Sequence, residues 1–275
     1  MAEEQNGLVT TGEGQRRSRG SHDQAPGHVL LIGLNRPEKY NAFNLALINQ
    51  LPQAYHRLEN DPEVRCGVLY GRGKHFTSGL DLAQVGPEIA RGALDFNRPG
   101  RRDPWRRDGS WLTPLVMAVH GLVMTLAIEL ALAADIRIAS SDARFSQLEI
   151  NRGIYAFGGA TARLPRDCGW GNAMRWLLTG EEYDATEALR IGLVQEVVAP
   201  DAQLDRALDI ARRISDRSAP LGVPATPASA HLARGGERAA FEILNQEVLR
   251  LLDSAEGQEC LRSFVERRDA RFIGR

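Results

Sequence analysis

Short apolar runs alternate with longer amphipathic stretches through the first two thirds of the chain. The apolar runs predict buried strands over His28–Leu34, Val64–Tyr70, Leu115–Val119 and Ile136–Ala139. Apolar residues at helical spacing predict helices over Asn44–Asn60, after Asp81 and over Met124–Ala134, and Leu8–Thr11 is a candidate strand beside the first run. Strand and helix therefore alternate, which is typical of parallel crossover units in an α/β fold.

The last third of the chain has a helical pattern. Helices are predicted over Asn172–Leu178, Ala185–Ile191, Leu204–Ser215 and Arg238–Arg267, with a Pro- and Ala-rich linker at Ala219–Pro227. Residues 1–26 are polar and are expected to be flexible, residues 27–200 to form the β/α core, and residues 201–275 to form a helical subdomain. The stretch Pro99–Trp111 is rich in Arg, Asp, Gly and Pro, which predicts a surface loop.

Composition narrows the choice of class. A chain of 275 residues with 43% hydrophobic residues can form one sizeable domain with a helical extension, and a net charge of −1 gives no general attraction to nucleic acid or acidic membranes. The cysteines Cys66, Cys168 and Cys260 are isolated and the six histidines are scattered, so neither a disulfide framework nor a metal site is expected. The chain lacks an export signal and a membrane-length apolar run, and these features together predict a cytoplasmic protein.

One acidic residue stands out because of its surroundings. Glu129 lies in the stretch TLAIELALAA, which is apolar all round and therefore predicts a buried helix. Because a buried carboxylate must be paired, hydrogen-bonded or protonated, Glu129 is a candidate catalytic residue. A structural ion pair with Arg137 explains the residue equally well.

Two further features are weaker evidence for an active site when each is considered alone. Glu149 lies at the edge of a core element, although most glutamates at such positions are simply exposed. The loop Gly71–Gly79 matches neither a dinucleotide-binding motif nor a P-loop, but free amides around Leu80 could hold an oxyanion. An ordinary strand-to-helix turn capped by Asp81 is the alternative, and Ser78 lacks the GxSxG context of a serine hydrolase.

Taken together, several segments resemble the enoyl-CoA hydratase/isomerase (crotonase) superfamily from about residue 28 to the C-terminus. The loop of that family against coenzyme A is similar to LNRPEKYNAFN, and its first oxyanion-hole segment to GRGKHFTSGLDL. Its two catalytic segments are similar to HGLVMTLAIELALAADIRIAS and FSQLEINRGIYAFGGATARL, and its run into the helical tail resembles LLTGEEYDATEALRIGLVQEVV.

The resemblance implies a ββα spiral core with a C-terminal helical subdomain that contributes to assembly, as a trimer or dimer of trimers, and to covering the active site. It implies an enoyl-CoA hydratase in which the backbone N–H groups of Leu80 and Leu126 bind the thioester oxygen, Glu129 is the general base and Glu149 the general acid. Neither a cofactor nor a metal is implied, and the expected partner is an acyl-CoA, not nucleic acid or a membrane. The implied substrate-binding residues are Lys39, Asn41, Ala42, His75, Thr77, Ser78, Gly79, Asp81, Tyr155 and Phe157.

The chain departs from the family pattern at two places. Thr125-Leu126-Ala127 replaces a glycine-rich oxyanion segment, and Ile154–Phe157 places two aromatic rings where acyl chains usually lie, which predicts a narrower or unusually shaped pocket. Related isomerase, lyase and thioester hydrolase reactions stay open. So does a catalytically silent protein that binds acyl-CoA, or RNA through the arginines of the Pro99–Trp111 loop, although a solvated loop or contacts to the phosphates of coenzyme A explain these more simply. The arginines concerned are Arg101, Arg102, Arg106 and Arg107.

Overall fold

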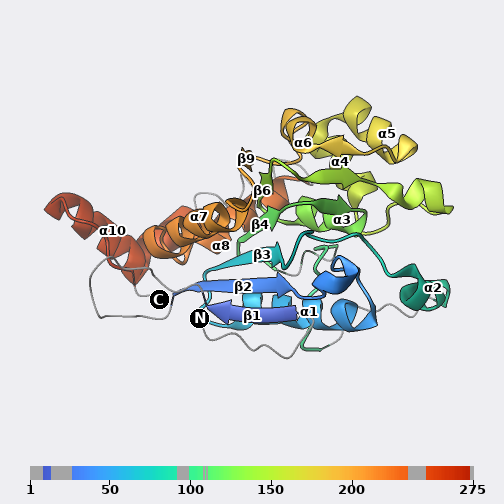
Figure 1. Cartoon of the computed structure of the whole chain (residues 1–275). Helices are drawn as coiled ribbons and strands as arrows, with labels where there is room; N and C mark the ends of the chain where they lie inside the picture. The colour runs from blue at the N-terminus through green and yellow to red at the C-terminus, as the bar shows by residue number, and fades with distance from the viewer. Residues whose placement is uncertain are drawn as a thin grey trace.

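The structure is a computed structural model, and it describes residues 9–13, 27–91, 99–107, 109, 111–234 and 246–272. Its larger sheet has six strands in the order β1-β2-β3-β4-β6-β9 (Figure 1). The edge strand β1 runs antiparallel to β2, and the other neighbours are parallel. These strands are β1 (Val9–Glu13), β2 (Val29–Leu34), β3 (Cys66–Gly71), β4 (Leu115–Val119), β6 (Ile136–Ser140) and β9 (Glu196–Val198).

Helices cover both faces of this sheet, so its central strands are apolar on both sides. Every residue of β2 and β4 is buried, as their uninterrupted apolar sequences predict. Helix α1 (Leu45–Asn60) packs on one face and is capped by Asn44, whose side chain accepts a hydrogen bond from Leu47 N. Helix α7 (Gln203–Arg217) covers the other face, where Ala207 and Ala211 allow close approach.

A second, smaller sheet makes the core a spiral. It contains β5 (Leu122–Met124), β7 (Arg144–Ser146) and β8 (Tyr183–Asp184), and a bridge from Thr77 to Val123 extends it. The order of strand in the large sheet, short segment in the small sheet, then helix occurs in successive turns. Helices α2 (Leu82–Ala90), α3 (Leu126–Ala133) and α4 (Ala160–Cys168) end these turns, the last after the short helix η2 (Leu148–Arg152). The predicted ββα spiral is therefore confirmed.

The C-terminal region is helical, as predicted, but two details of the prediction are wrong. The expected linker Ala219–Pro227 lies largely within helix α8 (Gly222–Ala233), because alanines favour a helix and Pro224 falls in the first turn, where no backbone donor is needed. The expected continuous helix over Arg238–Arg267 is interrupted: residues 246–253 are helical, and extended Ser254 then caps α10 (Ala255–Glu266). In Figure 1 these elements form an arm that extends beyond the sheet.

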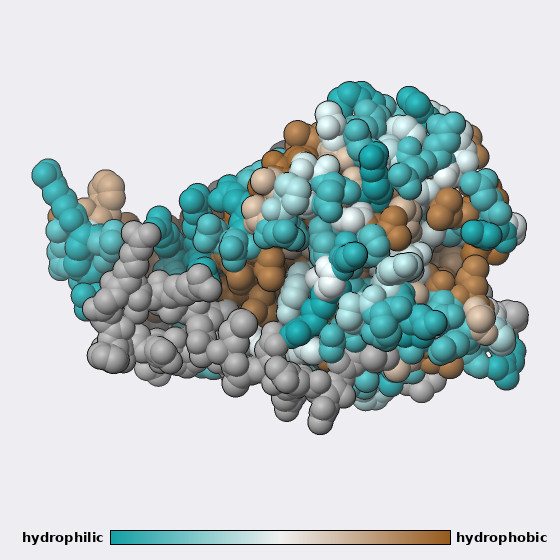
Figure 2. Space-filling model, viewed as in Figure 1, coloured by the Kyte–Doolittle hydropathy of each residue, from teal (hydrophilic) through white to brown (hydrophobic). Residues whose placement is uncertain are grey.

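Helices α5 (Trp170–Thr179) and α6 (Ala185–Arg190) flank β8 along the chain, and the short helix η1 (Pro37–Lys39) precedes α1. The candidate strand at Leu8–Thr11 is confirmed over the described residues, because residues 9–13 pair with β2 and bury Thr10, while 1–8 and 14–26 lie outside the described residues. The face shown in Figure 2 is mainly hydrophilic, with hydrophobic side chains gathered in a few patches, one of them where the arm joins the body.

The arginine-rich loop is not the solvated segment that its composition predicts. Arg106 is only 6% exposed, and its guanidinium carbon lies 3.4 Å from the centre of the Trp111 ring. Trp111 is fully buried, and its indole nitrogen donates to Asp103 O at 3.0 Å. The composition predicted a solvated loop because of its charged residues, but the burial of two tryptophans decides where the loop packs.

Candidate active site

The chain brings its two candidate oxyanion segments together through the repeat of the spiral. Leu80 and Leu126 each follow a short segment of the small sheet and each lie at or just before the start of a helix. Equivalent positions in successive turns are neighbours, and an added Cβ on Gly79 would lie 2.4 Å from Thr125 Oγ1. The two amides that the sequence singled out, 46 positions apart, therefore belong to adjoining segments of one site.

The backbone pairing around Leu80 leaves its N–H group directed away from its neighbouring strand. Phe43 N donates to Gly79 O at 2.8 Å, and Asp81 N donates to Phe43 O at 3.0 Å. In such a parallel bridge the intervening residue points its own N–H and C=O to the opposite side. The segments of Gly79 and Thr125 pack closely on that opposite side only because residue 79 lacks a side chain. The φ of +101° at Gly79 also favours glycine.

Thr125 carries the strain of the second segment. Its φ of 54° and ψ of −114° are unfavourable for a β-branched residue, so the position that suits glycine is Thr125 and not Leu126. Thr125 N donates to Ser146 O at 2.8 Å, which ties the segment to the next turn of the spiral. Leu126 is the first residue of α3, and its N–H is among the donors that a helix start leaves without a partner in the helix.

Glu129 is held by backbone amides. The side chain is buried, and Oε1 accepts hydrogen bonds from Gly158 N at 2.6 Å and from Ala160 N at 3.2 Å. Burial raises the pKa of Glu129, and the amides oppose that shift because they stabilise the ionised form. The alternative ion pair with Arg137 is wrong, since that guanidinium donates to Ala131 O at 3.3 Å and lies 4.0 Å from Asp167.

Glu149 lies in η2 and is also buried, so the expectation that it is simply exposed is wrong. Burial and, to a smaller extent, the negative charge of Glu129 raise the pKa of Glu149 to about 7. Glu129 therefore lies near enough to Glu149 for its charge to act on that carboxyl group. The carboxamide of Gln147, oriented to satisfy its neighbours, donates to both Glu149 oxygens at 2.9 and 3.1 Å and to Thr125 O at 3.2 Å.

Sequence reasoning missed three residues beside the carboxylates. Trp105 is buried, and its indole nitrogen donates to Leu126 O at 3.4 Å. An added Cβ on Gly158 would lie 2.5 Å from Glu129 Oε2 and 2.9 Å from Trp105 Cδ1, so Trp105 and Glu129 meet at this glycine. The dipeptide Gly158-Gly159 was an available signal for close backbone approach; nothing in the local sequence distinguishes Trp105 or Gln147.

Two of the predicted substrate-binding residues, Asn41 and Thr77, hold the first oxyanion loop together. The buried side chain of Asn41 donates to Arg72 O and His75 O, both at 2.8 Å, and accepts from Arg36 N at 2.7 Å. Thr77 is also buried, and its hydroxyl donates to Asn41 O at 2.7 Å and accepts from Gly79 N at 3.1 Å. These two side chains therefore fix the backbone of the loop, and their part in substrate binding stays a prediction.

The remaining predicted residues differ in their partners and in their exposure. Asp81 pairs with Arg36 at 2.9 Å, and the same arginine nitrogen donates to Ala42 O at 2.9 Å. His75 is half-buried, and its ring meets Tyr40 edge-on at 4.9 Å. The other side chains of this set remain accessible to a ligand to differing degrees: Lys39, Tyr155 and Phe157 are exposed, the latter two at 65% and 41%, and Ser78 is half-buried.

The described residues contain no cluster of three or more histidine, cysteine or acidic side chains that could hold a metal ion. No helix in that part of the chain is long and apolar enough to cross a membrane. The groups that the candidate site itself offers are two buried carboxyl groups and two backbone N–H groups. Such a site can polarise a carbonyl and move protons to and from neighbouring carbon and oxygen atoms.

Comparison with known proteins gives one consistent result. A family model described as enoyl-CoA hydratase/isomerase matches residues 24–275. An (E)-benzylidenesuccinyl-CoA hydratase from Thauera aromatica is 36% identical and covers 90% of this chain and 96% of its own length. An enoyl-CoA hydratase from Mycobacterium tuberculosis is 34% identical and covers 90% of this chain and 94% of its own length.

The crystal structure of a probable enoyl-CoA hydratase/isomerase from Mycobacterium abscessus is similar over 96% of this chain and 98% of that chain. It is 49% identical in sequence, with a TM-score of 0.87. The similarity therefore includes the helical arm as well as the spiral core.

Proposed function

The chain belongs to the enoyl-CoA hydratase/isomerase family, and from that premise we propose that Glu129 and Glu149 add water across the 2,3 double bond of a 2-enoyl-CoA thioester. The product is a 3-hydroxyacyl-CoA. The observation that carries this proposal is the pair of buried, electrostatically coupled carboxyl groups next to the amides of Leu80 and Leu126.

The reaction begins with polarisation of the thioester. The N–H groups of Leu80 and Leu126 bind the thioester oxygen, which draws electron density from the double bond and makes Cβ electrophilic. Fixed backbone donors in a buried site are effective because they need no reorganisation as negative charge develops on oxygen. The bonds of Gly79 and Asp81 to Phe43 and of Thr125 to Ser146 support this role by fixing the backbone on both sides.

Two proton transfers complete the addition. Glu129 takes a proton from water as the water oxygen bonds to Cβ, and its two amide donors favour the ionised form that a base requires. Glu149 gives its proton to Cα of the enolate, and its pKa of about 7 keeps part of the population protonated near neutral pH. The carboxyl groups exchange their protonation states in the reaction. Glu129 then releases its proton to solvent and Glu149 takes one up, which restores the starting state.

The wider expectations follow from the same premise. The substrate is an acyl-CoA, and the mechanism uses only groups of the protein. We propose assembly as a trimer or dimer of trimers through the helical arm, because α10 exposes Phe264 at 84% and Val265 at 80%. Three free cysteines support a reducing, cytoplasmic location. The divisions at residues 26 and 200 stay predictions.

The test is hydration of crotonyl-CoA and related 2-enoyl-CoAs, followed by loss of the enoyl-thioester absorbance. Glu129→Gln and Glu149→Gln should each lower kcat by about 10²–10⁴-fold, the usual contribution of a positioned acid or base. Glu182→Gln is the matched control because that side chain is 53% exposed. Wild-type rates in either active-site variant would show the assignment to be wrong, and product analysis on a panel of acyl-CoAs separates hydration from isomerase, lyase and thioester hydrolase reactions.

A further inference from the structure

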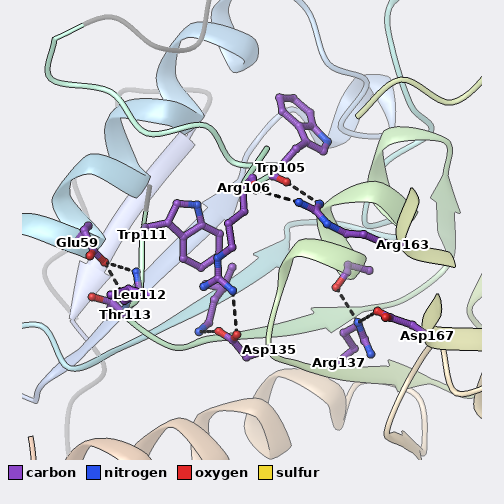
Figure 3. A network of polar contacts seen from close by, with 12 residues as sticks. Glu59, Trp105, Arg106, Trp111, Leu112, Thr113, Asp135, Arg137, Arg163 and Asp167 are labelled. Carbon is purple, nitrogen blue, oxygen red and sulfur yellow. Dashed lines mark hydrogen bonds and ion pairs between the residues drawn. The ribbon is translucent and has the colours of Figure 1, made fainter. Parts of the chain in front are cut away.

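A second polar centre lies at the other end of α3 from the oxyanion segment. A cavity of about 170 Å³ is lined by the last residues of that helix and by six charged side chains. These are Arg106, Asp135, Arg137, Arg163, Asp167 and Arg234. Figure 3 shows five of them converging from the arginine-rich loop, β6 and α4, with Arg106 against the ring of Trp111.

Arg106 presents an unused edge of its guanidinium group. Its side chain is 5% exposed, and Nη1 pairs with Asp135 Oδ1 at 3.0 Å. Nε and Nη2 are buried and have no hydrogen-bond partner within the described part of the chain. These two nitrogens form one edge of the planar group, whose parallel N–H bonds match two oxygens of a phosphate or carboxylate.

The charges around the cavity are unbalanced. The lining holds two more positive than negative side chains, and both aspartates are already engaged, Asp135 with Leu115 N as well as Arg106, and Asp167 with Arg166. No described acidic side chain forms an ion pair with Arg163 or Arg234. Burial lowers the pKa of Arg163, and neighbouring guanidinium groups lower it further, as expected for crowded cations without a counter-ion.

We propose that this cavity binds a phosphate group as a dianion, and that a small shift of the buried Arg106 side chain turns its Nε and Nη2 edge toward the anion as the principal donor. A phosphate carries between one and a half and two negative charges near pH 7 (about −1.5 to −2), which balances the lining better than a single carboxylate does. The volume exceeds the roughly 30 Å³ that a water occupies and accommodates a phosphate with part of the molecule that bears it. Arg137 covers the carbonyl end of α3 through Ala131 O, which reduces repulsion of an anion there.

The cavity is connected to the proposed active site through Arg163. This side chain donates to Trp105 O at 2.6 Å and to Arg106 O at 2.9 Å (Figure 3). Trp105 contacts the Glu129 site at Gly158, and Arg163 lies one turn after Ala160, which donates to Glu129. A bound anion would therefore order the arginine-rich loop that supplies Trp105. This role goes beyond the proposed hydration and does not depend on it.

The experiment titrates the full-length protein with inorganic phosphate at constant ionic strength and measures binding by calorimetry. One saturable site per chain is expected. Arg106→Lys keeps the charge but removes the paired donors, and should weaken binding at least tenfold; Arg234→Gln, at an exposed residue, should weaken it about threefold. Arg144→Gln, at a side chain 54% exposed and outside the cavity, should bind like wild type. Folding of each variant is checked by circular dichroism.

Repeating the titration with coenzyme A and with dephospho-coenzyme A distinguishes the source of the phosphate. If phosphate still binds in saturating coenzyme A, the ligand is a separate molecule; if only coenzyme A with its 3′-phosphate displaces it, the cavity holds the substrate's own phosphate. Absence of saturable binding, or wild-type binding in both Arg106→Lys and Arg234→Gln, overturns the proposal. Hydration of crotonyl-CoA is measured in parallel, so failure of the anion site is distinguishable from failure of the proposed enzyme activity.

Discussion

The two polar centres at α3 bury charges of opposite sign and satisfy them in different ways. At the oxyanion end, Glu129 and Glu149 lie beside backbone amides, and burial raises the pKa of both carboxyl groups. At the other end, Arg106 and its neighbours carry guanidinium groups, which keep their positive charge in proteins. A buried acid can take up a proton, but a buried arginine must find acceptors.

This difference separates a site suited to chemistry from one suited to binding. Carboxyl groups whose pKa is raised by burial can gain and lose protons in each turnover. Guanidinium groups do not exchange protons in this way. Their surplus positive charge is therefore stabilised by a bound anion or by ion pairs within the protein. Four predictions test this contrast, and their expected effects on stability or activity decrease from the first to the last.

Replacing Arg106 by Met should have the largest effect on stability. The change leaves Asp135 without its cation and removes the stack on Trp111, so we expect a loss of about 3 kcal/mol in the free energy of unfolding. Urea denaturation measures it, with Arg144→Met as the exposed control. A loss no larger than that of the control would mean that Arg106 is not structurally paired.

At the opposite end of α3, Gly158→Ala should disturb the carboxylate without changing any charge. The new Cβ would lie 2.5 Å from Glu129 Oε2, so we expect displacement of that side chain and a fall in kcat of about 10²-fold, which corresponds to roughly 2.7 kcal/mol. Gly171→Ala is the control, since no atom lies within 4 Å of its added Cβ. Similar kcat values for the two variants would contradict the proposed geometry.

The protonation of Glu149 should make stability depend on pH. The folded pKa of about 7 lies above the ordinary value of 4.5, so the folded state binds more protons between these values, and its stability falls as pH rises. Between pH 5 and 8, wild type should lose about 2 kcal/mol relative to Glu149→Gln, measured by denaturation at each pH. Hydration should also slow above pH 7. Parallel stability curves for the two proteins would argue against the raised pKa.

The smallest effect concerns strain that involves no charge. Thr125→Gly should relieve the positive φ at the second oxyanion segment and stabilise the fold by about 1 kcal/mol, after the entropy of the added glycine is considered. Thr125→Ala removes the hydroxyl but keeps Cβ, so it retains the strain and serves as control. Urea midpoints measure both. The strain is absent if the glycine variant is no more stable than the alanine variant.

Much of the fold could be predicted from local patterns. The uninterrupted apolar strands at Val29–Leu34 and Leu115–Val119 indicated a parallel sheet covered on both faces, and the apolar helix around Glu129 indicated a buried carboxylate. Helix α8 was missed because its two prolines resembled a linker, although alanines dominate its propensity. The family resemblance is confirmed, whereas the roles of the site residues stay predictions until they are measured.

The sequence by itself determined the strand and helix order, the burial of Glu129 and the family, because apolar periodicity and motif order are written along the chain. Three contacts follow only from the tertiary structure. Gly158 N donates to Glu129, the carboxamide of Gln147 donates to Glu149, and the guanidinium group of Arg106 stacks on Trp111. Those contacts join segments separated in sequence, and their energies depend on desolvation and on the direction of N–H groups after packing. No local pattern encodes either quantity, so the chemistry of the site appears only when the turns of the spiral stack.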